Sequence, residues 1–258
     1  MSAQSLPLDQ HCVLVTGGAR GLGLAISQAF LAQGARVVIN YRRSADAAQA
    51  LAAEYPHTAL ALQADVTQPE QVAALVEAAH AHFQAPITTV VNNALVSFTF
   101  NGDARPTIDT LRWRDMNQQL EGAVQGALNT VQATVAGMRQ QAFGRIINIG
   151  TNLFQNPVVP YHDYTAAKAA LLSFTRTLAH ELGPDNITAN MVSGGLLRST
   201  DASSATPEEV FDLIANNTPL RRVTTPAEFA DAVLFFASPW ARAVNGQNLI
   251  VDGGLVKG

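Results

Sequence analysis

Cysteine and long apolar runs are scarce in this sequence. The single cysteine, Cys12, excludes an internal disulfide, and its place in an apolar, strand-like run predicts that it packs in a core. No apolar run approaches the roughly 20 residues that a membrane-spanning helix needs. Residues 1–10 lack the basic start and apolar centre of a secretory signal. These absences predict a soluble, cytoplasmic protein without a membrane partner.

Charged side chains and metal-ligand patterns are scarce as well. Charged residues make up 14% of the chain, and the net charge of −4 argues against non-specific binding to nucleic acid. Only His80 and His82 of the six histidines are closely spaced, and we interpret them as exposed helix surface, so no metal site is predicted. Hydrophobic residues make up 48% of the 258 residues, enough for one large α/β core.

Apolar strand-like runs and helical patterns alternate along the whole chain. The runs that predict strands are 13–15, 37–39, 59–62, 87–91, 146–149, 188–192 and 248–251. The patterns that predict helices are 24–33, 45–55, 69–83, 109–140, 165–182 and 226–237. The strands are apolar on both faces, and no linker or repeat interrupts them. The sequence therefore predicts a single-domain α/β fold, a Rossmann-type doubly wound parallel sheet with helices on both faces.

A glycine-rich turn joins the first predicted strand to the first predicted helix. Its glycines are Gly17, Gly21 and Gly23. Backbone amides and the dipole of a helix N-terminus can hold a pyrophosphate at such a turn, and a Cβ would block the approach. Such turns also serve simply as turns, but its place as the first strand-to-helix connection favours a nucleotide site.

The residues that end the second predicted strand discriminate between two nucleotides. An acidic side chain usually ends this strand in an NAD site and binds the adenosine ribose. We place Asn40 at that position, followed by Tyr41, Arg42, Arg43 and Ser44, with Arg20 in the glycine turn. No carboxylate repels a 2′-phosphate there, and guanidinium groups are present to bind one. NADP(H) is the predicted cofactor; the alternative is that the arginines are solvated surface residues.

Lysine is scarce as well: the chain has 14 arginines and only two lysines, Lys168 and Lys257. Lys168 follows Tyr164 by four residues in a helical pattern, so both side chains lie on one face. An ammonium about 4 Å away could lower the pKa of the phenol by up to about three units, into the range of general acid–base catalysis. An isolated pair of this spacing would more often be exposed helix surface, and only the other motifs favour catalysis.

Four motifs in this order resemble the short-chain dehydrogenase/reductase family, over about 13–254. They are Thr16-Gly17-x-x-x-Gly21-x-Gly23, Asn92-Asn93-Ala94, Tyr164-x-x-x-Lys168, and the tail Gly246-Gln247 with Asp252-Gly253-Gly254. Within the family the chain looks most like the 3-oxoacyl-[acyl-carrier-protein] reductases. The resemblance implies that Tyr164 is the acid, that Lys168 holds the nicotinamide ribose and lowers the tyrosine pKa, and that a hydroxyl group polarises the substrate carbonyl.

The resemblance also implies a set of residues that contact the cofactor. Besides the residues that follow the second strand, these are Gly17, Ala19, Arg20, Gly21, Leu22 and Gly23 in the turn, Asp65 and Val66 beside the adenine, Asn92, Asn93 and Ala94 along the cofactor, and Gly195, Leu196 and Leu197 near the nicotinamide carboxamide.

Several positions depart from the family pattern. Thr151 stands where the family has its catalytic serine; it keeps the hydroxyl and adds a methyl group. Ala123 replaces an asparagine whose backbone carbonyl anchors a water that leads to the lysine, and Leu95 replaces a glycine near the nicotinamide. Gly194-Gly195 replaces a Pro-Gly pair after the sixth strand.

The substrate side is predicted less sharply. Residues 196–222 form a long insert where a lid usually lies. The side chains that could wall an apolar pocket, although each also fits core or interface packing, are Phe98, Phe100, Leu153, Phe154, Val158 and Val159. His162 either contacts the substrate or is exposed.

These features predict an NADPH-dependent carbonyl reductase whose favoured substrate is a 3-oxoacyl thioester. The alternatives are a reductase of another ketone, quinone or pterin, and a nicotinamide-binding regulator without catalytic activity. An acyl carrier protein is a candidate partner, although Ala142 and Asp185 stand where carrier-specific reductases of the family have basic docking residues. The resemblance implies a homotetramer packed through the 109–140 and 165–182 helices.

Overall fold

Seven parallel strands form one sheet in the order β3-β2-β1-β4-β5-β6-β7. The computed structural model describes residues 5–95, 105–198, 200, 203–204 and 206–257. The strands are β1 (Cys12–Val15), β2 (Arg36–Tyr41), β3 (Ala59–Gln63), β4 (Thr89–Asn92), β5 (Gly144–Thr151), β6 (Ile187–Gly194) and β7 (Asn248–Val251). The predicted doubly wound parallel sheet is confirmed, and the strand order reverses between β1 and β4, where such folds bind ligands.

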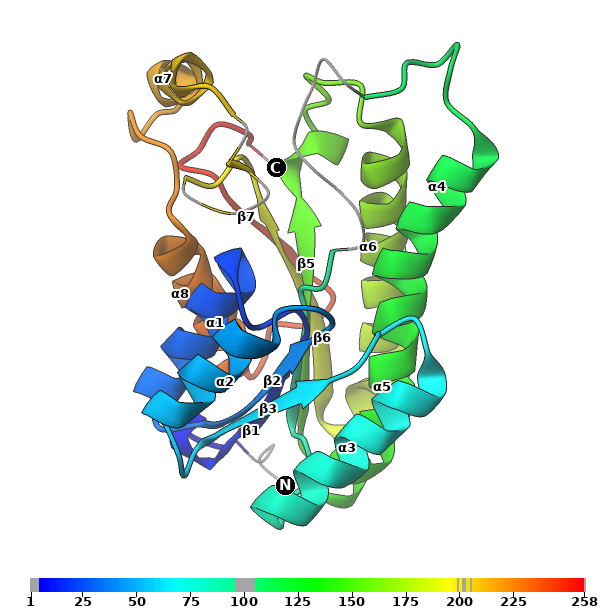
Figure 1. Cartoon of the computed structure of the whole chain (residues 1–258), viewed down its shortest axis with the longest axis vertical. Coiled ribbons are helices and arrows are strands. Elements are labelled where there is room, and N and C mark those ends of the chain that lie inside the picture. The colour runs from blue at the N-terminus through cyan, green and yellow to red at the C-terminus, as the bar shows by residue number, and fades with distance from the viewer. Residues whose placement is uncertain (1–4, 96–104, 199, 201–202, 205, 258) are drawn as a thin grey trace.

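Helices cover both faces of the sheet (Figure 1). One face carries α1 (Gly21–Ala32), α2 (Ala45–Glu54) and α8 (Pro226–Ala237). The other carries α3 (Pro69–Phe83), α4 (Trp113–Leu120), α5 (Gly126–Gln140) and α6 (His162–Leu182). Among the described residues, no helix has both the length and the apolar composition that crossing a bilayer would require.

Successive apolar side chains of each strand point to opposite faces of the sheet, so a separate apolar core forms on each face. On β1, Val13 and Val15 pack with the α1 and α8 side chains, while Cys12 and Leu14 pack with those of α3, α5 and α6. Successive side chains of a strand point to opposite faces, so an uninterrupted apolar strand is buried only when both faces are covered. Cys12 is fully buried, and burial raises the pKa of its thiol to about 12.

Two helical segments differ from the sequence prediction. The predicted 109–140 helix begins at Trp113, where the Asp115 carboxylate accepts hydrogen bonds from the backbone N and Nε of Arg112. A π-helical turn, Glu121–Gln125, then separates α4 from α5. Such wider turns inside helices often occur at functional sites.

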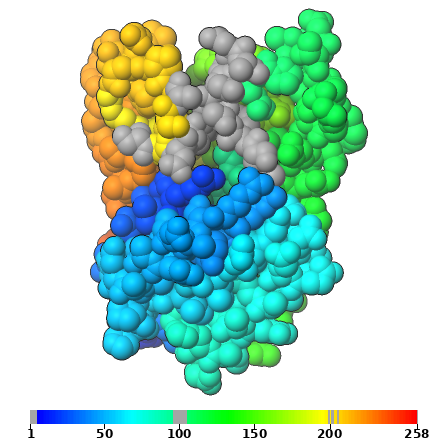
Figure 2. Space-filling model, viewed as in Figure 1, coloured from blue at the N-terminus to red at the C-terminus, as the bar shows by residue number. Residues whose placement is uncertain are grey.

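Within the predicted lid insert, an unpredicted helix, α7, spans Glu208–Asn217. Pro207 precedes it, and Glu208 and Glu209 lie in its first turn, where acidic residues suit the helix dipole. A proline followed by two acidic residues is a helix-start signal that can be seen in the sequence. Figure 2 shows the α7 segment and α4 standing apart at the same end of the molecule, the end towards which β5 points in Figure 1.

Candidate active site

The glycine turn after β1 has a backbone that only glycine adopts readily. Gly17 and Gly21 have φ values of +62° and +52°. A Cβ on Gly23 would lie 2.1 Å from the Gly17 carbonyl oxygen, so α1 could not pack against the turn. No side chain caps the N-terminus of α1 through a hydrogen bond, and its first turn holds no acidic residue. This cradle fits the phosphates of a dinucleotide, which the amides and dipole of a helix N-terminus attract.

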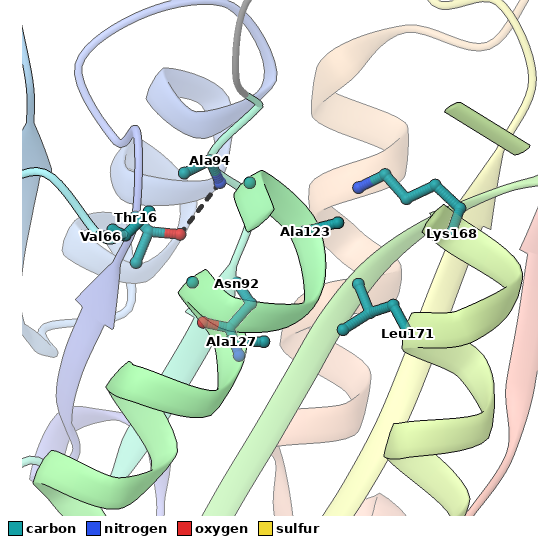
Figure 3. Close-up of a pocket in the computed structure, with 10 residues that line it drawn as sticks. Thr16, Val66, Asn92, Ala94, Ala123, Ala127, Lys168 and Leu171 are labelled. Atoms are coloured by element: carbon teal, nitrogen blue, oxygen red, sulfur yellow. Dashed lines mark hydrogen bonds between the residues drawn. The ribbon is translucent and has the colours of Figure 1, made fainter. Parts of the chain in front are cut away.

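Thr16 joins the glycine turn to the residues that follow β4. Its Oγ1 accepts hydrogen bonds from the backbone N of Asn93, at 2.9 Å, and from that of Ala94, at 3.0 Å. The Asn93 side chain donates back to the Thr16 carbonyl oxygen at 2.9 Å. Figure 3 shows the Thr16–Ala94 bond at the edge of a small pocket. The structure thus brings Asn93 and Ala94 beside the glycines, as the sequence predicts for a cofactor site.

Asn92 has a different environment from its neighbours. Its Nδ2 donates to Asn148 Oδ1 at 2.8 Å, and its Oδ1 accepts from Thr130 Oγ1 at 2.7 Å. The Asn92 side chain therefore ties β4 to β5 and α5 inside the core, and it borders the pocket in Figure 3.

Asn40 does not end β2, contrary to the prediction. Its side chain is buried, accepts from the Gly17 backbone N at 3.2 Å and donates to the Ala64 carbonyl oxygen at 3.0 Å. Alternation along β2 turns Asn40 inward, so it supports the glycine turn instead of facing solvent. The strand ends at half-buried Tyr41, followed by exposed Arg42 and Arg43 and half-buried Ser44.

Arg42 forms an ion pair with Asp65, the residue predicted beside the adenine. The Nε–Oδ2 distance is 3.0 Å. Burial alone would raise the pKa of Asp65, but hydrogen bonds from Thr67 and the charge of Arg42 outweigh it and hold that pKa below its usual value. The next residue, Val66, is buried and borders the pocket of Figure 3. Arg42 therefore stands where β2 and β3 end, with one carboxylate already bound.

The other predicted cofactor residues lie at the ends of neighbouring elements. Ala19 is buried, Arg20 is exposed and Leu22 is half-buried, at the start of α1. Gly195, Leu196 and Leu197 follow β6 and are half-buried, and the Leu197 carbonyl accepts a hydrogen bond from Ser203 Oγ at 2.8 Å.

The three predicted catalytic residues are all buried. Thr151 is the last residue of β5, and Tyr164 and Lys168 lie on successive turns of α6. The Lys168 Nζ atom is 5.8 Å from the centre of the Tyr164 ring. The structure thus brings together a hydroxyl group, a phenol and an amine from two elements.

The predicted lowering of the tyrosine pKa by the lysine is wrong for this structure. Burial raises the pKa of Tyr164 to about 12, opposed by a hydrogen bond with Thr151. Burial also lowers the pKa of Lys168 to about 8. Removing both groups from water disfavours the phenolate and the ammonium alike, and this outweighs the helical spacing from which the prediction was made.

Lys168 and Ala123 border the same small cavity. Its volume is about 10 Å³, and Gly122, Gly126 and Leu171 also line it (Figure 3). A space of this size holds about one water molecule. Ala123 lies in the π-helical turn, so the irregular turn brings this departure from the family pattern beside the lysine.

An apolar cluster surrounds the tyrosine. Leu95, Leu153 and Val159 pack against buried Tyr161 and Tyr164. Phe154 belongs to a different cluster, and Val158 and His162 are exposed. Phe98 and Phe100 lie outside the described residues. Leu95, Leu153 and Val159 are therefore the described residues that would wall an apolar substrate site.

Two polar pairs beside the site were missed by the sequence analysis. Asn152, directly after Thr151, donates to the buried Asp252 carboxylate at 2.8 Å, and thereby ties the end of β5 to the residues after β7. Asp163, directly before Tyr164, pairs with Arg105. The partners are 100 and 58 residues apart in the chain, and no local pattern links them.

Comparisons with known proteins agree with this geometry. A family model described as Enoyl-(Acyl carrier protein) reductase matches residues 17–256. The 3-oxoacyl-[acyl-carrier-protein] reductase MabA of Mycobacterium tuberculosis is 32% identical over 256 residues, which cover 98% of this chain and 95% of that protein. The 3-oxoacyl-[acyl-carrier-protein] reductase of Synechocystis sp. is 34% identical, over 96% of this chain and 98% of its own.

A solved structure supports the same assignment. A protein assigned as a gluconate dehydrogenase, from Agrobacterium tumefaciens, matches with a TM-score of 0.86 at 28% identity, over 96% of this chain and 97% of that one. The chain therefore belongs to the short-chain dehydrogenase/reductase family of oxidoreductases, which use nicotinamide cofactors, and it has 3-oxoacyl-[acyl-carrier-protein] reductases among its relatives.

Proposed function

We propose that the protein is an NADPH-dependent reductase that converts 3-oxoacyl thioesters to 3-hydroxyacyl thioesters. One observation carries the catalytic part of this proposal: Tyr164 is hydrogen-bonded with Thr151 and lies one helical turn from the buried Lys168. A proton donor, a second hydroxyl group and a cation are the groups that a protein can add to the reduction of a carbonyl group by a nicotinamide.

The pKa values favour the reductive direction. With a pKa of about 12, the Tyr164 phenol is protonated at neutral pH and can give its proton to the substrate oxygen. Thr151 can donate a hydrogen bond to the same oxygen as negative charge develops there. With a pKa of about 8, Lys168 is mostly charged at pH 7 and stabilises the phenolate that remains. A bound nicotinamide supplies the hydride that the carbonyl carbon accepts.

The preference for NADPH follows from the end of β2. No carboxylate stands at Tyr41, Arg42 or Arg43, so nothing at these positions repels a 2′-phosphate. Arg43 is exposed beside the Arg42–Asp65 ion pair, and Arg20 is exposed in the glycine turn. These guanidinium groups support the choice of NADPH over NADH.

The choice of a 3-oxoacyl thioester is supported by the relatives and by the site. The Mycobacterium tuberculosis and Synechocystis relatives are both 3-oxoacyl-[acyl-carrier-protein] reductases. Leu95, Leu153 and Val159 beside Tyr164 suit an acyl chain. The homotetramer and the cytoplasmic location implied by the resemblance and the composition stay predictions.

Oxidation of NADPH by the purified protein tests the proposal, measured with acetoacetyl thioesters, simple ketones, quinones and pterins as alternative substrates. The thioesters should give the highest kcat/KM. A higher kcat/KM with another class would contradict the substrate, and no turnover with any of them would favour the non-catalytic regulator.

The second candidate function is reduction of a different small carbonyl compound. It is favoured by the likeness to the protein assigned as a gluconate dehydrogenase, whose substrate is not a thioester. The same panel of substrates separates the two candidates.

A further inference from the structure

A buried ion pair lies directly beside the proposed proton donor. The Arg105 guanidinium donates through Nη2 to both carboxylate oxygens of Asp163. Their side chains are only 12% and 7% exposed. Asp163 precedes Tyr164 in the first turn of α6, and Arg105 belongs to the β4–α4 connection. This one contact therefore joins the β4–α4 connection to the helix that carries Tyr164 and Lys168.

Arg105 holds the start of α6 at a second point. Its guanidinium carbon lies 5.5 Å from the centre of the Tyr161 ring. Tyr161 is buried and packs in the same apolar cluster as Tyr164, Leu95, Leu153 and Val159. A cation over an aromatic face adds attraction, most when both are shielded from water. Arg105 thus contacts the residues on both sides of His162, which is itself exposed.

We propose that Arg105 and Asp163 are positioning residues of the active site, which hold the first turn of α6 and with it Tyr164. The inference rests on the proposed role of Tyr164 as the proton donor. Neither residue is assigned a contact with substrate or cofactor.

Loss of either partner would leave the other charge buried and unpaired at the first turn of α6. Without Arg105 this is the Asp163 carboxylate, and without the Asp163 charge it is the guanidinium. A buried charge without its partner is strongly destabilising, so either change should displace the turn that carries Tyr164.

Three variants test this: Arg105→Met, Asp163→Asn and the double variant. The readouts are kcat and KM in the reductive direction. Arg105→Met and Asp163→Asn should each lower kcat by roughly tenfold and change KM little, because a displaced Tyr164 slows the proton step and not substrate binding. The double variant leaves no unpaired charge and should lie nearer the wild type than either single one.

Matched controls separate positioning from a general loss of stability. Arg112→Met with Asp115→Asn removes an exposed ion pair at the start of α4 and should leave kcat unchanged. Arg105→Lys keeps the positive charge and should restore most of the kcat that Arg105→Met loses. Melting temperatures of all variants report the effect on folding separately. If Arg105→Met folds poorly, Asp163→Asn and Arg105→Lys are compared with the wild type instead.

The outcomes distinguish this inference from the function on which it rests. Losses of kcat in the two single variants that are largely recovered in the double variant support the positioning role. If kcat of all three variants equals that of the wild type while Tyr164→Phe is inactive, the pair is only structural and the inference is wrong. Turnover by Tyr164→Phe at the wild-type rate would overturn the proposed function, and the inference with it.

Discussion

The Lys168 amine donates a hydrogen bond to the backbone carbonyl oxygen of Ile149, with 2.7 Å between Nζ and O. Ile149 lies two residues before Thr151 on β5, so the bond fixes the amine relative to the catalytic hydroxyl group. It also satisfies one donor of a side chain that is only 4% exposed. The strand that carries Thr151 and the helix that carries Tyr164 are therefore joined through the lysine.

The first prediction concerns the proton donor. Tyr164→Phe should lower kcat by at least about 100-fold, the usual scale of one general acid. The binding of NADPH, measured by fluorescence titration, should stay nearly intact, because the phenol is assigned only to the proton step. Turnover at the wild-type rate would show that another group supplies the proton.

Thr151 tests the second hydroxyl group. Thr151→Ala should also reduce kcat, because it removes the hydrogen bond with Tyr164 and the donor to the substrate oxygen. Thr151→Ser keeps the hydroxyl and should retain substantial activity, so it is the matched control. Equal losses in the two variants would mean that the methyl group matters and not the hydroxyl.

The third prediction concerns the cofactor. Losing a charge-assisted contact to a 2′-phosphate costs about 1.5–3 kcal/mol, so Arg20→Ala or Arg42→Ala should raise KM for NADPH by roughly tenfold or more. KM for NADH should change little. Arg43→Ala should behave in the same way if Asp65 keeps Arg42 occupied. Exposed Arg242, which donates to the Pro239 carbonyl, supplies a control.

A wild type equally efficient with the two cofactors would contradict this reading of residues 40–44. So would an unchanged KM in all of the arginine variants, with Arg242→Ala as the reference.

The fourth prediction concerns the acyl carrier. Arg139, a basic residue near the expected docking position, is paired with Asp185 at 2.8 Å between Nε and Oδ2. That carboxylate cancels charge that an acidic carrier protein would need. We expect kcat/KM for carrier-bound and coenzyme A-bound forms of one acyl chain to lie within about tenfold at physiological salt.

Asp185→Ala should free Arg139 and increase kcat/KM for the carrier-bound substrate at low salt only. A large carrier preference of the wild type that collapses at high salt would show that other basic residues dock the carrier.

The fifth prediction concerns stability in acid. His11 is fully buried; its Nε2 lies 3.2 Å from the Leu6 carbonyl oxygen and its Nδ1 lies 2.8 Å from Thr89 Oγ1. Burial, helped by the charge of Arg145, lowers its pKa from 6.5 to about 4. Between these pH values the unfolded chain binds a proton that the folded chain does not. The free energy of unfolding should therefore fall by roughly 3 kcal/mol as the pH drops from 6.5 to 4.

Urea denaturation of the wild type, His11→Gln and the exposed-residue control His57→Gln checks this. Only His11→Gln should lose that part of the pH dependence. Identical profiles for the wild type and His11→Gln would show that other groups cause the acid loss.

Local patterns determined much of this fold. An apolar strand followed by Gly17, Gly21 and Gly23 favours a tight turn before a helix, because positive φ angles favour glycine and the packing at Gly23 leaves no room for a Cβ. The four-residue spacing of Tyr164 and Lys168 places them on one helix face whatever surrounds them. Predictions of this kind were confirmed because each depends on residues that are near one another in the chain.

Only the tertiary structure decided the electrostatics of the site. The depth at which α6 packs against β5 buries Tyr164 and Lys168, and desolvation then moves both pKa values against the charged forms. The inward turn of Asn40, and the pairing of Arg105 with Asp163 across 58 residues, depend on which surfaces meet. Sequence spacing determines which residues share a helix face or a turn. The burial of a side chain and the partner of each charge are decided only when distant segments pack together.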